Sequence, residues 1–144
     1  MTGIFESHAH YEDEAFDEDR DVLLKSLPEN GIKYVVDVGS SIDTCHKIIE
    51  LIPKWDYMYG ALGIHPEEIR TVTDEDMEWL RKEAAANGKI VAIGEIGLDY
   101  YWDKDNKAQQ KEFFERQLVL AKELKKPVIV HSREAALDTY EVIK

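Results

Sequence analysis

The clearest strand signal in this 144-residue chain is the stretch IVAIGE at residues 90–95. Apolar and small residues run without a break into a single carboxylate, Glu95. A short apolar run rich in β-branched residues and bounded by polar segments is typical of a buried strand. The stretch therefore predicts a buried strand that ends on a reactive side chain.

The same kind of unit recurs on both sides of this stretch. Each apolar run is followed by a short loop and an amphipathic helix that leads to the next run, which is the pattern of βαβ units and a parallel sheet. Strands are expected at residues 3–7, 34–38, 57–62, 90–95 and 128–131, and the second is apolar enough to be buried on both faces. Helices are expected at 17–27, from Ser40 or Ser41 to Pro53, from Thr73 to Asn87, from Asn106 to Lys126, and at 135–143. Asn106, with Gln109 three residues later, gives a start that resembles a capping box.

Composition places the chain among globular proteins with one domain, because 44% of its residues are hydrophobic. No stretch approaches the roughly 20 consecutive apolar residues of a membrane span. The first residues lack the basic region and apolar core of a signal peptide, so we expect a cytoplasmic protein without a membrane partner. The single cysteine, Cys45, cannot form an internal disulfide and is expected to pack as a small apolar side chain.

The formal net charge of −12 argues against a broad electrostatic surface for nucleic acid. Part of this acidity lies in YEDEAFDEDRD at residues 11–21, which we interpret as a solvated loop running into a helix. Bound cations can reverse the sign of a local site. The charge therefore leaves a nucleic-acid substrate open, provided that its phosphates are met locally.

Two histidines stand two residues apart near the start of the chain, in FESHAH at residues 5–10. Side chains two apart on a strand project to the same side, so His8 and His10 can hold one metal ion between them. A pair of solvated histidines is the alternative reading. The pair alone does not decide between the two.

Further reactive side chains follow the other predicted strands. His65 follows the third strand, Glu95 and Asp99 follow the fourth, and His131 ends the fifth. The C-terminal ends of parallel strands are where (β/α)8 barrels and open α/β sheets build their sites. Imidazole suits zinc, iron, nickel or manganese, and a carboxylate can bridge two cations. Two metals roughly 3.5–4 Å apart can activate water for phosphate hydrolysis.

Each of these residues also has a structural alternative. Glu95 is either a bridging ligand or an acid paired with a lysine or a backbone amide, and His131 is either a ligand or a core histidine. His65 is either a substrate-facing or acid/base residue or a turn histidine, and Asp99 either orients a ligand or caps the loop. Three aromatic residues either stack the bases of a single-stranded substrate or pack on their own helix: Tyr100, Tyr101 and Trp102.

Four motifs together resemble the TatD-like metal-dependent deoxyribonucleases, a family of amidohydrolase-like TIM barrels. They are FESHAH at 5–10, GIHP at 63–66, GEIGLDY at 94–100 and PVIVHSR at 127–133. The resemblance implies that one or two divalent ions (Mg, Mn, Zn, Ni or Fe) are held by His8, His10, Glu95 and His131. It also implies a site that faces the substrate with His65, Asp99 and Arg133.

The activity implied by this resemblance is hydrolysis of phosphodiester bonds in DNA, of the 3′–5′ exonuclease type, by two-metal activation of water. The substrate would be single-stranded DNA. Glu95 and His65 would be the catalytic residues.

The sequence departs from the family pattern in two ways. Glu6 stands where the family more often has aspartate. A complete (β/α)8 barrel has about 250 residues, so residues 1–144 are expected to be the N-terminal portion of such a barrel, apparently truncated at its C-terminus. The family's further ligands, a histidine and an aspartate from later strands, have no counterpart in this chain. Strands one and five would then be open edges, which favours self-association.

Two other functions are compatible with the sequence. One is another amidohydrolase-like or histidinol-phosphatase-like (PHP-like) metal phosphoesterase that acts on a small molecule. The other is a non-catalytic truncated fragment that binds metal. Substrate preference distinguishes the first from a nuclease, and the absence of turnover with metal bound would indicate the second.

Overall fold

The computed structural model describes residues 3–144 and contains one five-stranded sheet with the strand order β1-β2-β3-β4-β5. Its strands are β1 (Ile4–Ala9), β2 (Ile32–Val38), β3 (Met58–Leu62), β4 (Ile90–Asp99) and β5 (Val128–Arg133). Every neighbouring pair is parallel. The predicted α/β class with five parallel βα units is therefore confirmed.

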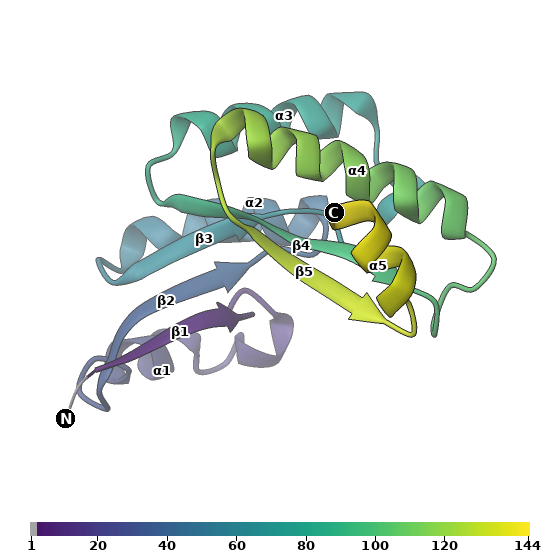
Figure 1. Ribbon diagram of the computed structural model, residues 1–144. Helices are drawn as coiled ribbons and strands as arrows, with labels where there is room; N and C mark the ends of the chain where they lie inside the picture. The colour runs from purple at the N-terminus through teal and green to yellow at the C-terminus, as the bar shows by residue number, and fades with distance from the viewer. Residues whose placement is uncertain (1–2) are drawn as a thin grey trace.

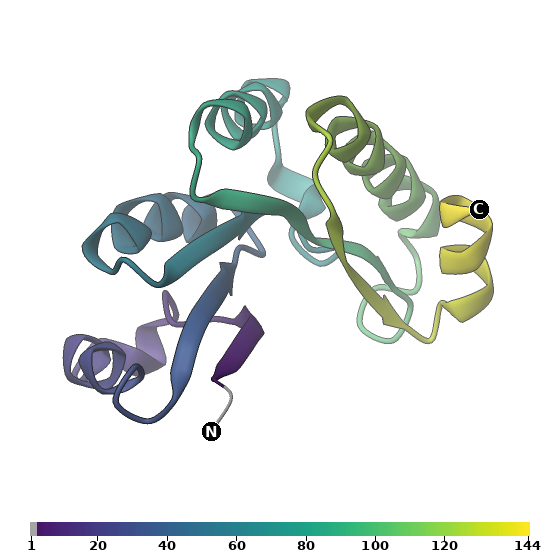
Figure 2. The ribbon, with the colours of Figure 1, turned by 60° about the vertical axis from the view of Figure 1, so that its left-hand side comes forward.

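The helices lie on the convex side of the sheet, which curves around an open concave face (Figure 1 and Figure 2). They are α1 (Arg20–Ser26), α2 (Ile42–Leu51), α3 (Asp74–Ala86), α4 (Lys107–Leu124) and α5 (Ala136–Ile143), with short 3-10 turns η1 (Glu14–Phe16), η2 (Ile52–Lys54) and η3 (Ile69–Thr71). The arrangement is that of a half-barrel. Within residues 3–144, none of these helices has the length and apolar character that a membrane crossing needs.

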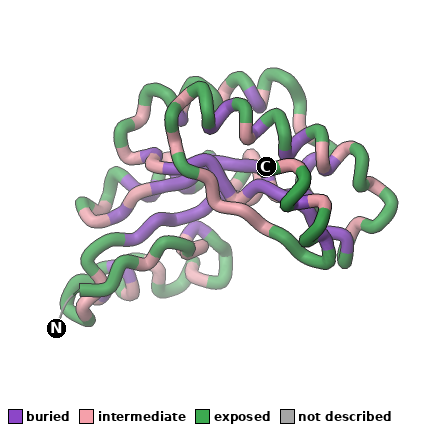
Figure 3. The backbone as a smooth tube through the Cα atoms, viewed as in Figure 1, coloured by how far each residue is buried: buried purple, intermediate pink, exposed green. Residues whose placement is uncertain are grey.

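Apolar side chains form a large core between the sheet and the helices, and a smaller cluster on the concave face. The smaller cluster consists of Val36, Val38, Ala61 and Ala92. Figure 3 shows that β3 and β4 are mostly buried, whereas β1 is mostly exposed. Tyr34 is 51% exposed, so the expectation that the second strand is buried on both faces is wrong at this end of β2.

Local capping explains where two helices begin. Ser41 accepts a hydrogen bond from the Thr44 N–H and starts α2, and Thr73 forms a capping box with Asp76 at the start of α3. The predicted cap at Asn106 is wrong, because its side chain makes no capping hydrogen bond. Its backbone, at φ −113° and ψ 26°, lies outside the extended region that N-cap residues typically adopt.

Three strands run further toward the site than their sequence patterns predict. β1 includes His8, β5 continues to Arg133, and β4 continues past Glu95 to Asp99, where a loop was expected. Pairing with β5 explains the extension of β4, since Gly97 pairs with His131 and Asp99 with Arg133. Gly97 has φ +148°, and a Cβ there would overlap the carbonyl oxygen of His131, so only glycine permits this close approach.

β1, which carries the FESHAH motif, and β4, which carries the GEIGLDY motif, each contain one extra residue relative to a neighbouring strand. Three steps along β1, from Glu6 to Ala9, match two steps along β2. Three steps along β4, from Ile93 to Ile96, match two steps along β5. An extra residue of this kind bends a strand and re-aims its side chains, and such irregularities are common beside active sites. The two irregularities flank His8 and Glu95.

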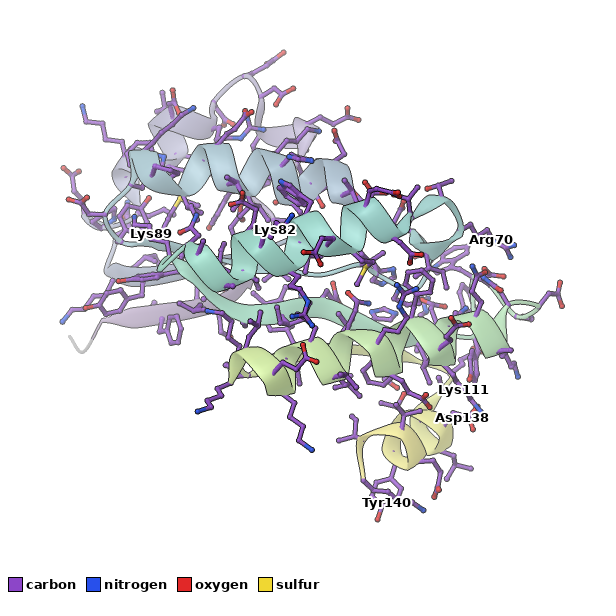
Figure 4. The ribbon with its side chains drawn as sticks, turned by 90° about the horizontal axis from the view of Figure 1, so that it is seen from above. Arg70, Lys82, Lys89, Lys111, Asp138 and Tyr140 are labelled. Carbon is purple, nitrogen blue, oxygen red and sulfur yellow. The ribbon has the colours of Figure 1, made fainter. Side chains whose placement is uncertain are left out.

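One carboxylate of the last helix contacts two other parts of the fold. Lys111 Nζ of α4 lies 2.8 Å from Asp138 Oδ2 of α5, and the two side chains face each other in Figure 4. The Tyr100 hydroxyl donates a hydrogen bond of 2.6 Å to the same oxygen. These contacts hold α5 beside the end of β4.

Candidate metal centre

The histidines of the first motif converge with Glu95 of β4. His8 Nε2 lies 3.2 Å from His10 Nε2 and 3.4 Å from Glu95 Oε2. One ligand atom from each of the three residues lies within 4.8 Å of the others. Two ring nitrogens and a carboxylate oxygen therefore point at a common centre.

A second group lies at the ends of β3, β4 and β5. It consists of His65, Asp99 and His131, whose ligand atoms also lie within 4.8 Å of one another. His131 Nε2 is 2.9 Å from Asp99 Oδ2, and the rings of His65 and His131 are 4.2 Å apart between centroids. The side chain of Asp99 is only 1% exposed.

Glu95 connects the two groups through its two carboxylate oxygens. Oε2 faces His8, whereas Oε1 lies 3.2 Å from His131 Nδ1. The side chain of Glu95 is 14% exposed and therefore lies mostly out of solvent between the two groups. A carboxylate with one oxygen directed to each group is placed where it could be shared by two cations.

The charges of the site shift the pKa values of its acids and of His131. Burial raises the pKa of Glu95, but the hydrogen bond with His131 and the nearby His8 outweigh it and leave this pKa below its usual value. Burial also opposes ionisation of Asp99, and backbone N–H donors such as that of Trp102, together with His131, lower its pKa overall. The hydrogen bond with Glu95 raises the pKa of His131 against the opposing effect of burial. The site therefore favours anionic carboxylates and positive charge between them.

His65 has the opposite electrostatic character. Burial and then the nearby His131 lower the pKa of His65 to about 4. Its Nδ1 accepts a hydrogen bond of 3.3 Å from the Glu67 N–H. His65 is therefore a neutral imidazole at pH 7, with its other nitrogen available to the site.

The donor set fits one or two divalent cations. Neutral imidazole nitrogens and carboxylate oxygens are the ligands that zinc, manganese, iron and nickel share. His8 and His10 turn their Nε2 atoms toward each other, an arrangement that at most one proton can satisfy but that a shared cation suits. The metal ligands expected from the sequence are thus brought together, and so are His65 and Asp99.

Two buried carboxylates behind His10 were missed in the sequence. Glu12 is 5% exposed and places Oε1 3.6 Å from His10 Nδ1, on the ring edge opposite the cluster. Asp37 is fully buried at the end of β2 and accepts a hydrogen bond of 2.6 Å from the Tyr11 N–H. The interpretation of residues 11–21 as a solvated loop is therefore wrong at Glu12. The spacing of two that relates His8 to His10 continues to Glu12, which is the signal that could have revealed it.

The remaining predicted residues lie at the edge of the cluster or outside it. Arg133 ends β5 two residues after His131, and its guanidinium lies over the Tyr101 ring at 4.1 Å. Tyr100 is buried, whereas Tyr101 and Trp102 remain exposed. The cysteine, Cys45, is buried in the core as expected.

The sequence profile of the family described as TatD related DNase matches residues 5–144. This chain belongs to that family. A relative from Bacillus subtilis, the uncharacterized metal-dependent hydrolase YabD, is 40% identical over 141 residues, which cover 98% of this chain and 55% of the relative. The 3′-5′ ssDNA/RNA exonuclease TatD of Cronobacter sakazakii is 33% identical over 120 residues, which cover 83% of this chain and 45% of that protein.

Solved structures of TatD proteins share the fold. The TatD homologue YjjV from Escherichia coli superposes with a TM-score of 0.88 at 27% identity, over 96% of this chain and 54% of that structure. A TatD family hydrolase from Entamoeba histolytica gives a TM-score of 0.90 at 23% identity, over 98% of this chain and 53% of that one. The chain thus spans about half the length of the TatD relatives it matches, and its five strands correspond to part of a TIM barrel.

The buried Asp37 predicts an unusual dependence of stability on pH. Burial, and then the charge of Glu12, raise the pKa of Asp37 to about 7 from an unfolded value of 3.8. A raised carboxyl pKa leaves stability intact below the unfolded pKa and removes it as pH rises to the folded pKa, by up to about 1.4 kcal/mol per pH unit. Asp37→Asn keeps the acceptor oxygen for the Tyr11 N–H but cannot ionise.

We therefore expect Asp37→Asn to match the wild type near pH 4 and to exceed it in free energy of unfolding above about pH 7. Urea denaturation across this range measures the difference. Asp56→Asn, in an exposed turn, is the control and should follow the wild type throughout. Parallel curves for the wild type and Asp37→Asn would contradict the assignment of a buried, protonated Asp37.

Proposed function

We propose that this chain carries the N-terminal part, residues 1–144, of a metal-dependent phosphodiester hydrolase that acts on DNA. The observation that carries the proposal is the placement of Glu95 between two groups of histidines and acids, with one carboxylate oxygen directed to each. Two adjacent cation positions that share a carboxylate are typical of enzymes that displace oxygen at phosphorus. Membership of a family of TatD-related DNases supports the same chemistry.

In this proposal, the ligands of one or two divalent ions are His8, His10, Glu95 and His131. Bound divalent ions would neutralise the phosphate charge and lower the pKa of a water molecule. Asp99 fixes the ring of His131 through the contact at Nε2. His65 is neutral and accepts the Glu67 N–H at Nδ1, so its Nε2–H can donate a hydrogen bond to the substrate.

We further propose that the substrate is a single strand degraded from its 3′ end. The support is a relative named a 3′-5′ ssDNA/RNA exonuclease, which is 33% identical to this chain. A single strand also suits the charge of the chain, because a net charge of −12 disfavours the long electrostatic contact that a duplex would require. The same negative charge favours the second candidate, a phosphoesterase for a small molecule.

Cleavage of single-stranded DNA by the purified chain tests the nuclease proposal. With Mn²⁺ or Mg²⁺ we expect stepwise loss of nucleotides from the 3′ end of a 5′-labelled oligonucleotide, and none with a chelator. Glu95→Gln preserves shape but removes the shared charge, so we expect a loss of at least about 100-fold in rate. Glu29→Gln, in the exposed turn before β2 and so at the opposite edge of the sheet, is the matched control and should retain full activity.

The other outcomes of this experiment identify the rival functions. Hydrolysis of small phosphate esters with no cleavage of DNA would replace the nuclease by a small-molecule phosphoesterase. Metal binding without turnover of either substrate would make the chain a non-catalytic metal-binding unit. Equal rates for the wild type and Glu95→Gln would contradict the role of Glu95.

We also propose that copies of this chain associate through the open edges of the half-barrel. β1 and β5 each pair with one neighbour only among residues 3–144, and β1 exposes Ile4 and Phe5, at 51% and 61%. Unpaired strand edges with apolar side chains favour pairing with another chain.

Sedimentation of the purified chain measures this association. We expect a dimer or larger species, which Phe5→Lys should shift toward monomer because it places a charge on the edge strand. Val22→Lys, on the outer face of α1 and 74% exposed in the wild type, is the control and should not change the distribution. A monodisperse wild-type monomer would contradict the proposal.

A further inference from the structure

Two exposed aromatic rings and one arginine lie together beside the candidate metal centre. Tyr101 and Trp102 follow β4, and their rings meet edge to face with centroids 4.6 Å apart. The Arg133 guanidinium carbon at the end of β5 lies 4.1 Å from the Tyr101 centroid and 5.4 Å from that of Trp102. We call these three residues the aromatic platform.

The platform is joined to the metal centre through Asp99. Asp99 Oδ1 accepts hydrogen bonds of 2.9 Å from the backbone N–H groups of Tyr101 and Trp102. The other oxygen of the same carboxylate contacts His131 at 2.9 Å. One buried side chain therefore fixes the backbone that carries the two rings relative to the ligand groups.

Core packing does not account for the two rings. Tyr100 is 7% exposed and belongs to the core, whereas Tyr101 and Trp102 are 41% and 61% exposed. Trp102 is the more open of the two and lies further from the guanidinium, so one of its faces can receive another flat group. Aromatic side chains exposed in this way beside a positive charge are the elements with which proteins bind single-stranded nucleic acids.

Arg133 places a positive charge beside the site of a chain that is acidic overall, and this charge can attract a phosphate. No ion pair or hydrogen bond occupies its guanidinium among residues 3–144, where its contacts are the two aromatic rings. Its N–H donors remain available for phosphate oxygens, which guanidinium groups bind well. Arg133 and His131 are two residues apart on β5 and project to the same side, so a phosphate at Arg133 lies on the side of the metal centre.

We propose that the aromatic platform binds an unstacked nucleobase of a single-stranded substrate on Trp102, while Arg133 holds an adjoining phosphate. The inference rests on the proposed function, because it places one nucleotide of the strand next to the hydrolytic centre. Stacking on a ring requires no particular base, so the platform gives binding that depends on the presence of a base but not on its identity. A paired base in a duplex cannot present its face in this way.

The test compares binding of two fluorescent strands of equal length, oligothymidylate and the same backbone without bases, with Ca²⁺ as the divalent ion. We expect the wild type to bind the intact strand about 10-fold or more tightly than the abasic strand. Trp102→Ala should remove this preference, whereas Trp102→Phe should keep most of it. Arg133→Gln should weaken the binding of both strands and reduce the salt dependence, by about 0.7 in the logarithmic slope for one phosphate contact.

The matched control is Tyr140→Ala on α5. Tyr140 is also an exposed aromatic residue, at 65%, and has Lys144 Nζ 6.0 Å from its ring centroid, but it lies on the side of α5 that is turned away from α4 (Figure 4). This variant should bind both strands as the wild type does. Equal affinities of the wild type for intact and abasic strands, or an unchanged preference in Trp102→Ala, would overturn the proposal.

Cleavage measured on the same samples, with Mn²⁺ in place of Ca²⁺, keeps the two proposals separate. If the wild type cleaves DNA but binds both strands equally, the proposed base binding is wrong and the proposed nuclease activity stands. If the wild type prefers the intact strand, Trp102→Ala abolishes this preference and no cleavage occurs, the proposed nuclease activity is wrong and the platform stands as a binding site. Failure of the wild type to bind either strand would overturn the platform.

Discussion

Parallel pairing of all five strands is the constraint on which the site depends. It directs every strand toward the same edge of the half-barrel, so residues separated by more than 120 positions meet there. His8 lies in the first strand and His10 directly follows it, His65 follows the third strand, and His131 lies in the fifth. Glu95 of the fourth strand lies between them and offers one oxygen to each side. Reversing β1, β3 or β5 would have sent its histidines to the opposite edge.

Local irregularities in the strands set the positions of the site's side chains more finely than the regular sheet does. The extra residues in β1 and β4 interrupt regular pairing next to His8 and Glu95, and Gly97 lets β4 approach β5 closely enough for Asp99 to reach His131. Behind His10, the fully buried Asp37 has its pKa raised to about 7, so ionisation in the folded state is unfavourable. Buried acids that cost stability are common near functional sites. The burial of Asp37 therefore indicates that part of the fold serves the site at a cost in stability.

The sequence was sufficient to predict the order and type of the main elements, because apolar runs and the residues typical of helix starts and ends are local signals. The same local patterns correctly placed His65 just after its strand, but they predicted that Glu95 and His131 end their strands, whereas both lie inside β4 and β5. They did not reveal the continuation of β4 beyond Glu95, since that depends on pairing with a strand more than 30 residues away. The burial of Glu12 also escaped prediction, because its neighbour Asp37 lies on another strand and the acidic residues around Glu12 are exposed. The missing cap at Asn106 reflects backbone geometry that composition does not encode.

Binding of a divalent ion by the convergent histidines is tested most directly by titrating the purified chain with Mn²⁺ and recording electron paramagnetic resonance spectra. We predict at least one bound ion per chain, with binding lost in His10→Ala because one of the facing ring nitrogens is removed. The control is His46→Ala, because the ring of His46 packs on Trp79 of α3 and not at the site. This variant should bind the ion as the wild type does. A wild-type chain that binds no ion, or a His10→Ala chain that binds it unchanged, would contradict the central claim.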